Sequence, residues 1–504
     1  MSSNEPVQAS LESRPGATRS PVPVVFNEDF QDGIWTKYAA NPVLVRSQPW
    51  AESHYLCEPN LFFVDGLFRM WYAQMFPANG KTAVGYATSR DGFTWTKHPS
   101  NPVLALEQTE VHRPSVLRHE GRYYLFAVDD EYGKRGPATL RRWASADGIT
   151  WGDERLIMAS TQPWERQGLS NLAVVVDENG RWQMLYTSDC GLGGHFGYAW
   201  SDDGLAWTKH EGNPVIRDLY GGDPFLVKIG DGFYTWHSES MAGSLRIVCR
   251  RSRDMVTWER LGNHPQINYT QLWERGVNPE AGGTVNGWYG HLTDATLCEA
   301  GGRVFLIYQG AQTPLAVATF EGTFAELAER LLQPPLARWE PSAFGMVSGG
   351  VLTLADNDSD RAPLVVKIPG VRDRYTVQTR IRCFAGPTRR VSVVLGYADA
   401  RTFARVWLHD RGELFYQECL NGLLSLPTSI GQAAIGDDAW HDWDLALDAG
   451  EVRLTVDARP VGSGRLSAAL LQALAKHPVQ VGFSTHDTWA EIAYVRVGLP
   501  EGGS

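Results

Sequence analysis

The chain has 504 residues, a mass of 55.9 kDa and a formal net charge of −11, from 46 Lys and Arg against 57 Asp and Glu. This length allows two or three domains with large hydrophobic cores and excludes disorder as the main state. The acidity argues against nucleic-acid and anionic-membrane partners, because both require a basic protein face. No apolar run approaches the roughly 20 residues that a membrane-spanning helix needs.

Residues 1–21 are polar and rich in Ser and Pro, which predicts a disordered tail and not a signal peptide. The six cysteines are scattered, without a CxxC pair or a dense framework, and this indicates reduced thiols in a cytoplasmic protein. The chain also has 51 Gly, 28 Pro and 19 Trp. Such a composition favours a turn-rich, aromatic β protein.

A Ser-x-Asp-Gly-x-x-Trp segment recurs along the first half of the chain. Its copies end at Trp95, Trp151, Trp207 and Trp258, at intervals of 56, 56 and 51 residues, and the last copy has Met255 in place of Gly. A degenerate copy, Trp35-Thr36-Lys37, lies 60 residues before Trp95. A regular interval of this size predicts a repeat architecture.

Each repeat also contains two alternating apolar runs joined by a turn such as Asp65-Gly66, which is typical of a β-hairpin. Four strands per unit, repeated radially, predict a β-propeller. Its five inner strands are expected to begin near Glu58, Arg113, Asn171, Asp223 and Asp294. The fifth unit lacks a Trp-led outer strand, and the copy at Trp35 would supply it and close the ring.

The rest of the chain predicts a second domain. Thr323-Phe324-Ala325-Glu326 resembles a capping box, so residues 323–338 are expected to form a helical linker after a propeller of residues 35–322. Strict alternation over residues 339–504 predicts a β-sandwich. Residues 22–34 resemble the opening strand of concanavalin-like jelly-roll domains and are expected to pack on that sandwich. The predicted fold class is therefore all-β, a five-bladed β-propeller plus a C-terminal jelly-roll β-sandwich.

The repeat resembles the five-bladed propeller glycosidases of glycoside hydrolase families 43 and 32, some of which also carry a C-terminal sandwich. The resemblance implies acidic residues at the starts of inner strands, which act as nucleophile or base, as acid and as an orienting group. Glycoside hydrolysis uses two carboxyl groups, about 5 Å apart for retention and roughly 6.5–9.5 Å apart for inversion.

On this resemblance, Glu58 is the expected nucleophile or base, Asp223 or Glu165 the acid, and Asp294 the orienting carboxylate. Arg113 and Asn171 would grip sugar hydroxyls. Two positions depart from the family pattern, because Glu58 stands where an aspartate is usual and Asn171 is uncharged. The alternative for each acidic residue is a structural carboxylate bonded to backbone N–H groups.

Loops that enter the inner strands share a Gln-x-Trp pattern followed by Glu, and we expect them to face the same funnel. Trp can stack on a sugar ring, while Glu and Arg bind hydroxyl groups. The substrate-binding candidates from these loops are Trp50, Trp164, Trp273 and Arg166, with His112 and His291 at the mouth. The alternative is that each Trp only packs and that each Glu pairs with a neighbouring Arg.

The sequence thus predicts a glycoside hydrolase of carbohydrate metabolism that acts on a small glycoside or oligosaccharide, with its stereochemistry left open. Two alternatives remain, a non-catalytic carbohydrate-binding protein and a propeller enzyme that acts on a non-sugar metabolite. We expect no required cofactor and no metal ligand set, although the resemblance admits a calcium ion in the propeller axis. The oligomeric state is left open.

Overall fold

The computed structural model describes only part of the 504-residue chain. The described residues are 24–29, 34–45, 56–76, 81–130, 138–166, 168–189, 194–219, 221–241, 244–261, 266–267, 274, 277–278, 283–284, 292–310, 314–332, 339–340, 345–348, 351–356, 364–368, 374–383, 390–399, 401–409, 412–435, 439–476, 479–486 and 488–498. Strands dominate, and these residues include two helices, α1 (Phe324–Leu332) and α2 (Ala468–Leu474). Neither helix is long or apolar enough to cross a membrane.

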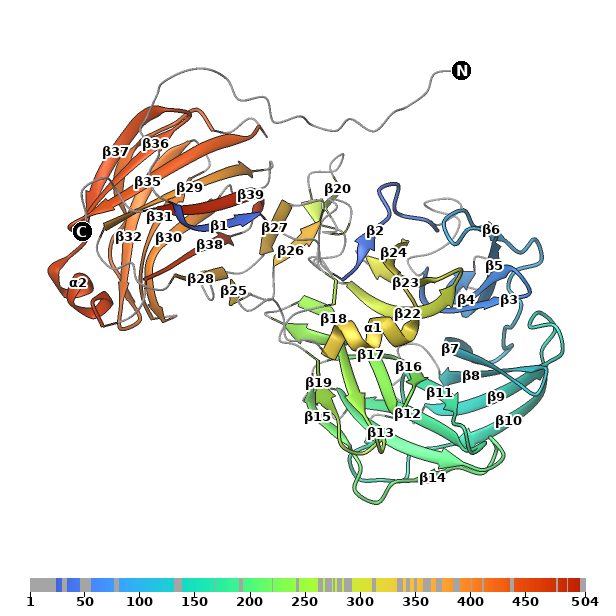
Figure 1. Ribbon diagram of the computed structural model, residues 1–504. Helices are drawn as coiled ribbons and strands as arrows, with labels where there is room; N and C mark the ends of the chain where they lie inside the picture. Colours follow the sequence, from blue (N-terminus) through green and yellow to red (C-terminus); the bar gives the residue numbers. More distant parts are fainter. Residues whose placement is uncertain are drawn as a thin grey trace, which may run out of the picture.

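Five sheets form the blades of a propeller (Figure 1). Blade 1 contains β3 (Leu56–Val64), β4 (Leu67–Phe76), β5 (Lys81–Ser89) and β6 (Thr96–Lys97). Blade 2 contains β7 (Glu110–His119), β8 (Arg122–Asp130), β9 (Thr139–Ser145) and β10 (Gly152–Met158). Blade 3 contains β11 (Leu172–Val176), β12 (Trp182–Asp189), β13 (Gly194–Ser201), β14 (Thr208–Lys209) and β15 (Ile216–Leu219).

Blade 4 contains β16 (Gly221–Ile229), β17 (Gly232–Met241), β18 (Ser244–Ser252) and β19 (Glu259–Arg260). Blade 5 contains β22 (Leu292–Ala300), β23 (Arg303–Gly310), β24 (Leu315–Glu321) and β2 (Thr36–Lys37). β20 (Val277–Asn278) and β21 (Gly283–Thr284) pair separately. Within blade 5, Thr36 pairs with Thr319 and Lys37 with Ala318. The predicted closure of the ring by the segment after Trp35 is confirmed.

Two eight-stranded sheets form the sandwich. One contains β1 (Val24–Asp29), β26 (Gly345–Ser348), β27 (Val351–Asp356), β29 (Arg374–Cys383), β35 (His441–Asp448), β36 (Glu451–Val456), β37 (Arg459–Arg465) and β39 (Thr488–Gly498). The other contains β25 (Trp339–Glu340), β28 (Leu364–Ile368), β30 (Arg390–Asp399), β31 (Thr402–Leu408), β32 (Glu413–Leu420), β33 (Leu423–Leu424), β34 (Thr428–Gln432) and β38 (Val479–His486). The predicted fold class is confirmed. Because β1 pairs with β39, strands of one sandwich sheet precede and follow the propeller in sequence.

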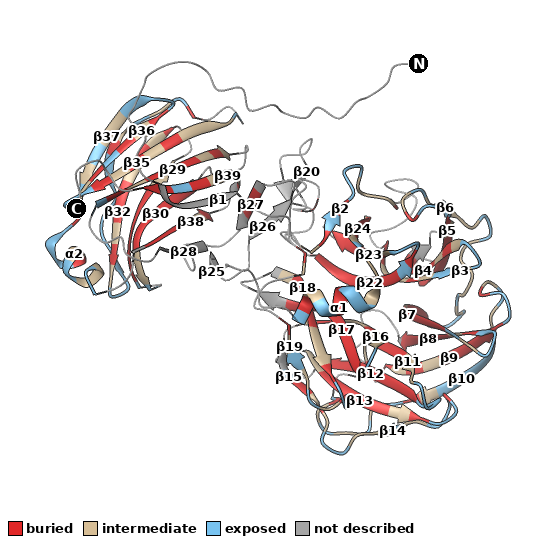
Figure 2. Ribbon diagram, viewed as in Figure 1, coloured by how far each residue is buried: buried red, intermediate tan, exposed pale blue. Residues whose placement is uncertain are grey.

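Both domains bury the alternate residues that the sequence pattern marks as apolar (Figure 2). In the sandwich, Val377 and Leu445 of one sheet share a core with Val393 and Phe483 of the other. Alternating strands pack in this way because successive side chains point to opposite faces.

The repeated Asp and Asn residues have local structural roles. Asp91 Oδ1 accepts hydrogen bonds from the backbone N of Phe93 at 2.8 Å and of Thr94 at 2.7 Å. Asn101 Oδ1 accepts from Tyr86 N at 2.9 Å, and Asn101 Nδ2 donates to Tyr86 O at 3.1 Å. The Asn-Pro segment therefore continues the blade beyond its third strand.

Polar side chains also connect neighbouring inner strands. Backbone N–H groups donate to side chains of the preceding blade: Leu61 to Thr296 at 3.1 Å, Val116 to Asn60 at 3.2 Å and Val174 to Ser115 at 3.2 Å. These three bonds join blades 5, 1, 2 and 3 in order. They occupy equivalent positions, so the ring is held by a repeated contact.

Two glycines with the same φ angle show separately the effect of backbone strain and the effect of crowding by a neighbouring side chain. Gly92 and Gly121 both have φ +79°, but a Cβ at Gly92 would lie 2.6 Å from Phe305 Cε1, whereas nothing lies within 4 Å of one at Gly121. We expect Gly121→Ala to lower the free energy of unfolding by about 1 kcal/mol through strain. Gly92→Ala should lose a further ~1–3 kcal/mol because the Phe305 ring must shift. Equal losses in urea denaturation would contradict this account.

Candidate functional site

Four inner strands carry the same irregularity where they begin. The pairing register shifts between Cys57 and Asn60 in β3, His112 and Ser115 in β7, Gly222 and Phe225 in β16, and Thr293 and Thr296 in β22. One residue within each shift has a left-handed backbone: Glu58 (φ 53°), Arg113 (φ 59°), Asp223 (φ 56°) and Asp294 (φ 54°). All four lie at expected site positions.

This conformation is costly for residues other than glycine, on the order of 1–3 kcal/mol each. Such strain persists only where the surrounding structure enforces it, and it is concentrated at functional sites. Bulges re-aim side chains out of the regular alternation of a strand. Here all four residues line one cavity of about 550 Å³ along the propeller axis.

Arg113 and Glu58 form the charged pair of the site. The backbone N of Arg113 donates to Glu58 Oε2 at 2.7 Å, and its Nε donates to Oε1 at 3.1 Å. Arg113 Nη1 also donates to the Ser170 hydroxyl. On the other side, Glu58 N donates to Asp294 Oδ2 at 3.3 Å. Glu58 and Asp294 thus each accept a backbone N–H from the next blade.

Asp223 and Asp294 form the second pair, and the charge of Asp223 acts on the Asp294 carboxyl group. Asn171 Nδ2 donates to Asp223 Oδ1. Burial raises the pKa of Asp223, against the opposing charge of Arg113. Burial, followed by the charges of Asp223 and Glu58, holds the pKa of Asp294 well above its usual range. The pair is therefore suited to retaining a proton.

The other expected substrate-binding residues that the structure describes do not line the cavity. His112 is buried beside Arg113, and Arg166 is exposed, with its Nε donating to Pro163 O at 3.2 Å. Trp164 stacks on Tyr186, with ring centroids 5.6 Å apart, and its Nε1 donates to Gln162 Oε1 at 2.7 Å. Trp50, Trp273 and His291 lie outside the described residues.

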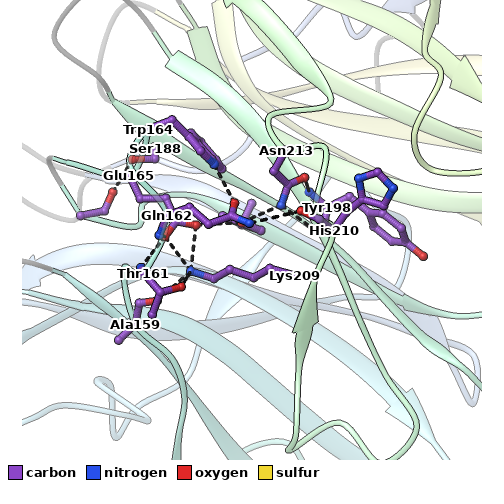
Figure 3. Close-up of polar contacts among 12 residues, drawn as sticks. Ala159, Thr161, Gln162, Trp164, Glu165, Ser188, Tyr198, Lys209, His210 and Asn213 are labelled. Atoms are coloured by element: carbon purple, nitrogen blue, oxygen red, sulfur yellow. Dashed lines mark hydrogen bonds and ion pairs between the residues drawn. The ribbon is translucent and has the colours of Figure 1, made fainter.

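Glu165 lies in a different environment from the other acidic candidates (Figure 3). Its side chain is fully buried, and Lys209 Nζ donates to both carboxylate oxygens, at 2.8 and 2.7 Å. Tyr186 OH donates at 2.9 Å, and the backbone N of Thr161 donates at 2.7 Å. Glu165 is not among the residues that line the cavity. Its contacts differ from the expectation of an acid in the funnel and indicate a structural role within blade 3.

Glu274 repeats this arrangement in blade 5. Its carboxylate accepts from Lys37 Nζ at 2.5 and 2.7 Å and from Tyr308 OH at 2.7 Å. Lys37 and Lys209 both follow Trp-Thr in the repeated segment. The sequence does contain a signal for this contact, namely the lysine that recurs after Trp-Thr. It could have predicted that these glutamates have a cationic partner. A second residue that the sequence did not single out is Ser170, which holds Arg113.

The site does not suit a cation. Among the residues that the structure describes, no three His, Cys, Asp or Glu side chains are grouped to hold a metal ion. Glu58 is bonded to a guanidinium group, Asp223 accepts a hydrogen bond from Asn171, and Asp294 accepts one from Glu58 N. These contacts occupy the oxygens that calcium would need, and we derive no step through calcium.

Comparison with known proteins gives one family match. Residues 113–275, about a third of the chain, match the model of the glycosyl hydrolases family 32 N-terminal domain. The match spans blades 2 to 4 and confirms the predicted resemblance to five-bladed propeller glycosidases.

Two curated relatives from Mycobacterium tuberculosis, the uncharacterized proteins Rv1502 of strain H37Rv and MT1551 of strain CDC 1551, are each 27% identical over 144 residues. The aligned part is 26% of this chain and 44% of each relative. The chain therefore spans less than half the length of the curated relatives it matches.

Among solved structures, xylan β-1,4-xylosidase from Bacillus halodurans C-125 is 14% identical with a TM-score of 0.40, covering 90% of this chain and 100% of that one. A glycosyl hydrolase from Bacteroides ovatus is 13% identical with a TM-score of 0.45, covering 58% and 95%. Both TM-scores are below 0.5.

The Glu165 contacts predict a loss of stability and not of chemistry. Removing one partner of a buried ion pair costs about 3–5 kcal/mol, so Glu165→Gln should lower the free energy of unfolding by about that amount. Arg453→Met, which removes an exposed partner of Glu451, should cost less than about 1 kcal/mol. Chemical denaturation measures both. Unchanged stability of Glu165→Gln together with lost turnover would return Glu165 to the catalytic set.

The Asp223–Asp294 pair predicts a dependence of stability on pH. Because the folded state raises both pKa values, it binds the shared proton more tightly than the unfolded chain does. The pair's contribution to the free energy of unfolding is therefore fully present below the ordinary aspartate pKa and is lost as pH rises through the raised values. Asp294→Asn should gain stability relative to wild type as pH rises, in denaturation measured from pH 4 to 9. The exposed control Asp65→Asn should show no such trend, and parallel curves for Asp294→Asn would refute the assignment.

Proposed function

We propose that this protein is a glycoside hydrolase that cleaves a small glycoside or oligosaccharide with the carboxyl groups of Glu58, Asp223 and Asp294. One observation carries the proposal: acidic side chains from three separate blades meet around Arg113 at one end of a cavity. The family match over residues 113–275 supports the same class of activity. Four strained residues at equivalent positions also support a functional site.

In the proposed mechanism, Asp223 is the general acid and Asp294 its partner. Burial raises the pKa of Asp223, which favours the protonated state that a general acid needs. Asp223 donates its proton to the glycosidic oxygen as the bond from that oxygen to the anomeric carbon breaks. Asp294 lies beside Asp223, and the interaction of the two carboxyl groups tunes when that proton leaves. Asn171 orients the Asp223 carboxyl through its amide.

Glu58 is the proposed nucleophile or base on the other side of the scissile bond. It either attacks the anomeric carbon or removes a proton from the attacking water, and its distance from Asp223 with substrate bound decides between retention and inversion. Arg113 bonds both Glu58 oxygens, so a substrate hydroxyl must displace or share one of these contacts. Arg113 would then bind substrate as well as position Glu58.

A second candidate function is a non-catalytic carbohydrate-binding protein. It is favoured by one observation, that the Glu58 and Asp294 carboxyls accept backbone N–H groups of the next blade. Such contacts alone would make these residues structural. A binding protein would retain affinity for sugars without turnover.

A panel of aryl glycosides and of arabino-, xylo- and fructo-oligosaccharides tests the two candidates. We expect hydrolysis of at least one substrate by the wild type, and a loss of about 10²-fold or more in kcat for Glu58→Gln and for Asp223→Asn. The matched control, Glu211→Gln, changes an exposed glutamate and should retain full activity.

Full activity in both folded site variants would overturn the assignment of roles. Sugar binding by calorimetry with no turnover across the panel would favour the non-catalytic candidate. Unfolding curves of each variant separate lost chemistry from lost structure.

A further inference from the structure

The axial cavity does not end at the carboxyl groups. Its lining continues along all five inner strands to Phe63, His119, Asp177 and Glu299, and to Phe324 at the start of α1. From Glu58 to Phe63 this is about 16 Å at ~3.3 Å per residue. Phe63 is 37% exposed and Glu299 is also exposed, so the far end of the cavity lies at the protein surface.

The inner strands present backbone N–H and C=O groups to this cavity. Within its blade, each inner strand pairs on one side only, with β4, β8, β12, β17 or β23. The other edge of each strand therefore offers N–H and C=O groups that still need hydrogen-bond partners. Side chains of Thr296, Asn60 and Ser115 satisfy three of the N–H groups. A cavity of about 550 Å³ can supply water to the others.

This volume far exceeds the roughly 10–15 Å³ that a single water needs, so the cavity has room for many waters. Water next to unpaired backbone groups is stabilised by the bonds it makes there. At the near end of the column, it would meet the buried Asp223 and Asp294 pair. At the far end, His119, Asp177 and Glu299 provide a polar mouth.

We propose that the axial cavity is a water-filled conduit that connects the carboxyl pair with the opposite face of the propeller. Its use in turnover rests on the proposed function. Each hydrolysis adds one water across the glycosidic bond, with H to the leaving oxygen and OH to the anomeric carbon, and the acid then regains the proton that this water released. A bound glycoside covers the carboxyls from the substrate side. The conduit lets water and protons exchange from behind while substrate is in place.

The conduit can be tested without any substrate. Val175 lines the cavity, is partly buried and lies four residues beyond Asn171, whereas Val248 is fully buried outside it. We expect methyl methanethiosulfonate to modify Val175→Cys at least 10-fold faster than Val248→Cys in the folded protein, as measured by peptide mass spectrometry. A maleimide on a large polyethylene glycol should modify neither. Equal rates for the two cysteines with the small reagent would overturn the conduit.

A second experiment tests the use of the conduit. Val175→Met, Val175→Phe and Val175→Trp narrow the cavity in steps, and we expect kcat to fall with side-chain size, to about a tenth for Trp, with KM unchanged. Leu156→Trp, at a position 57% exposed on the outer strand of blade 2, should leave kcat unchanged.

The graded series keeps the test valid where the largest variant fails to fold. Unchanged kcat in folded Val175→Phe would refute exchange through the conduit during turnover. Should the wild type hydrolyse no glycoside, the proposed function fails, while the thiol labelling still decides whether the conduit exists.

Discussion

Three acidic side chains of the described residues, Glu58, Asp223 and Asp294, lie around Arg113, and this electrostatic constraint governs the centre of the propeller. Isolated charges are costly to bury. The site offsets this cost in two ways: the Arg113 guanidinium group pairs with Glu58, and burial raises the pKa of Asp223 and Asp294, which favours their neutral forms. Loss of the Arg113 side chain, or ionisation of both Asp223 and Asp294, would leave unpaired negative charge at the propeller axis. Under the proposed function, a carboxyl group paired with Arg113 would act opposite carboxyl groups of raised pKa, which matches the division of roles in glycoside hydrolysis.

The repeat architecture is what brings these groups together. Each blade adds one inner strand to the axis, and the same bulge with a left-handed residue recurs in four of them. The side chains at these positions also bond the next blade, as Asp294 does to Glu58 N and Glu58 to Arg113 N. The proposed chemistry and the contacts between blades therefore use the same atoms. Substitutions in this ring of contacts should be judged by stability as well as by turnover.

The glutamates of this propeller have two different kinds of environment. Glu165 and Glu274 are more deeply buried than Glu58, but each has a lysine and a tyrosine as fixed partners. A carboxylate saturated in this way has no free oxygen for a substrate. Among the described residues, the Glu58 carboxylate bonds only Arg113, and Glu58 lines the cavity. The two groups of glutamates differ in the number of fixed partners and in access to the cavity, and not in burial alone.

The spacing of Ser-x-Asp-Gly-x-x-Trp determined the number of blades, the closing strand at Trp35 and the positions Glu58, Arg113, Asn171, Asp223 and Asp294, because a repeat must place equivalent residues equivalently. Alternation alone determined the sandwich. The sequence could not distinguish Glu165 from Asp223, since both are acidic residues near the start of an inner strand. Only the tertiary structure decided that Lys209 reaches Glu165 from 44 residues away and that Asp294 of blade 5 lies beside Asp223 of blade 4. Protonation and access depend on such distant neighbours, which no local pattern encodes.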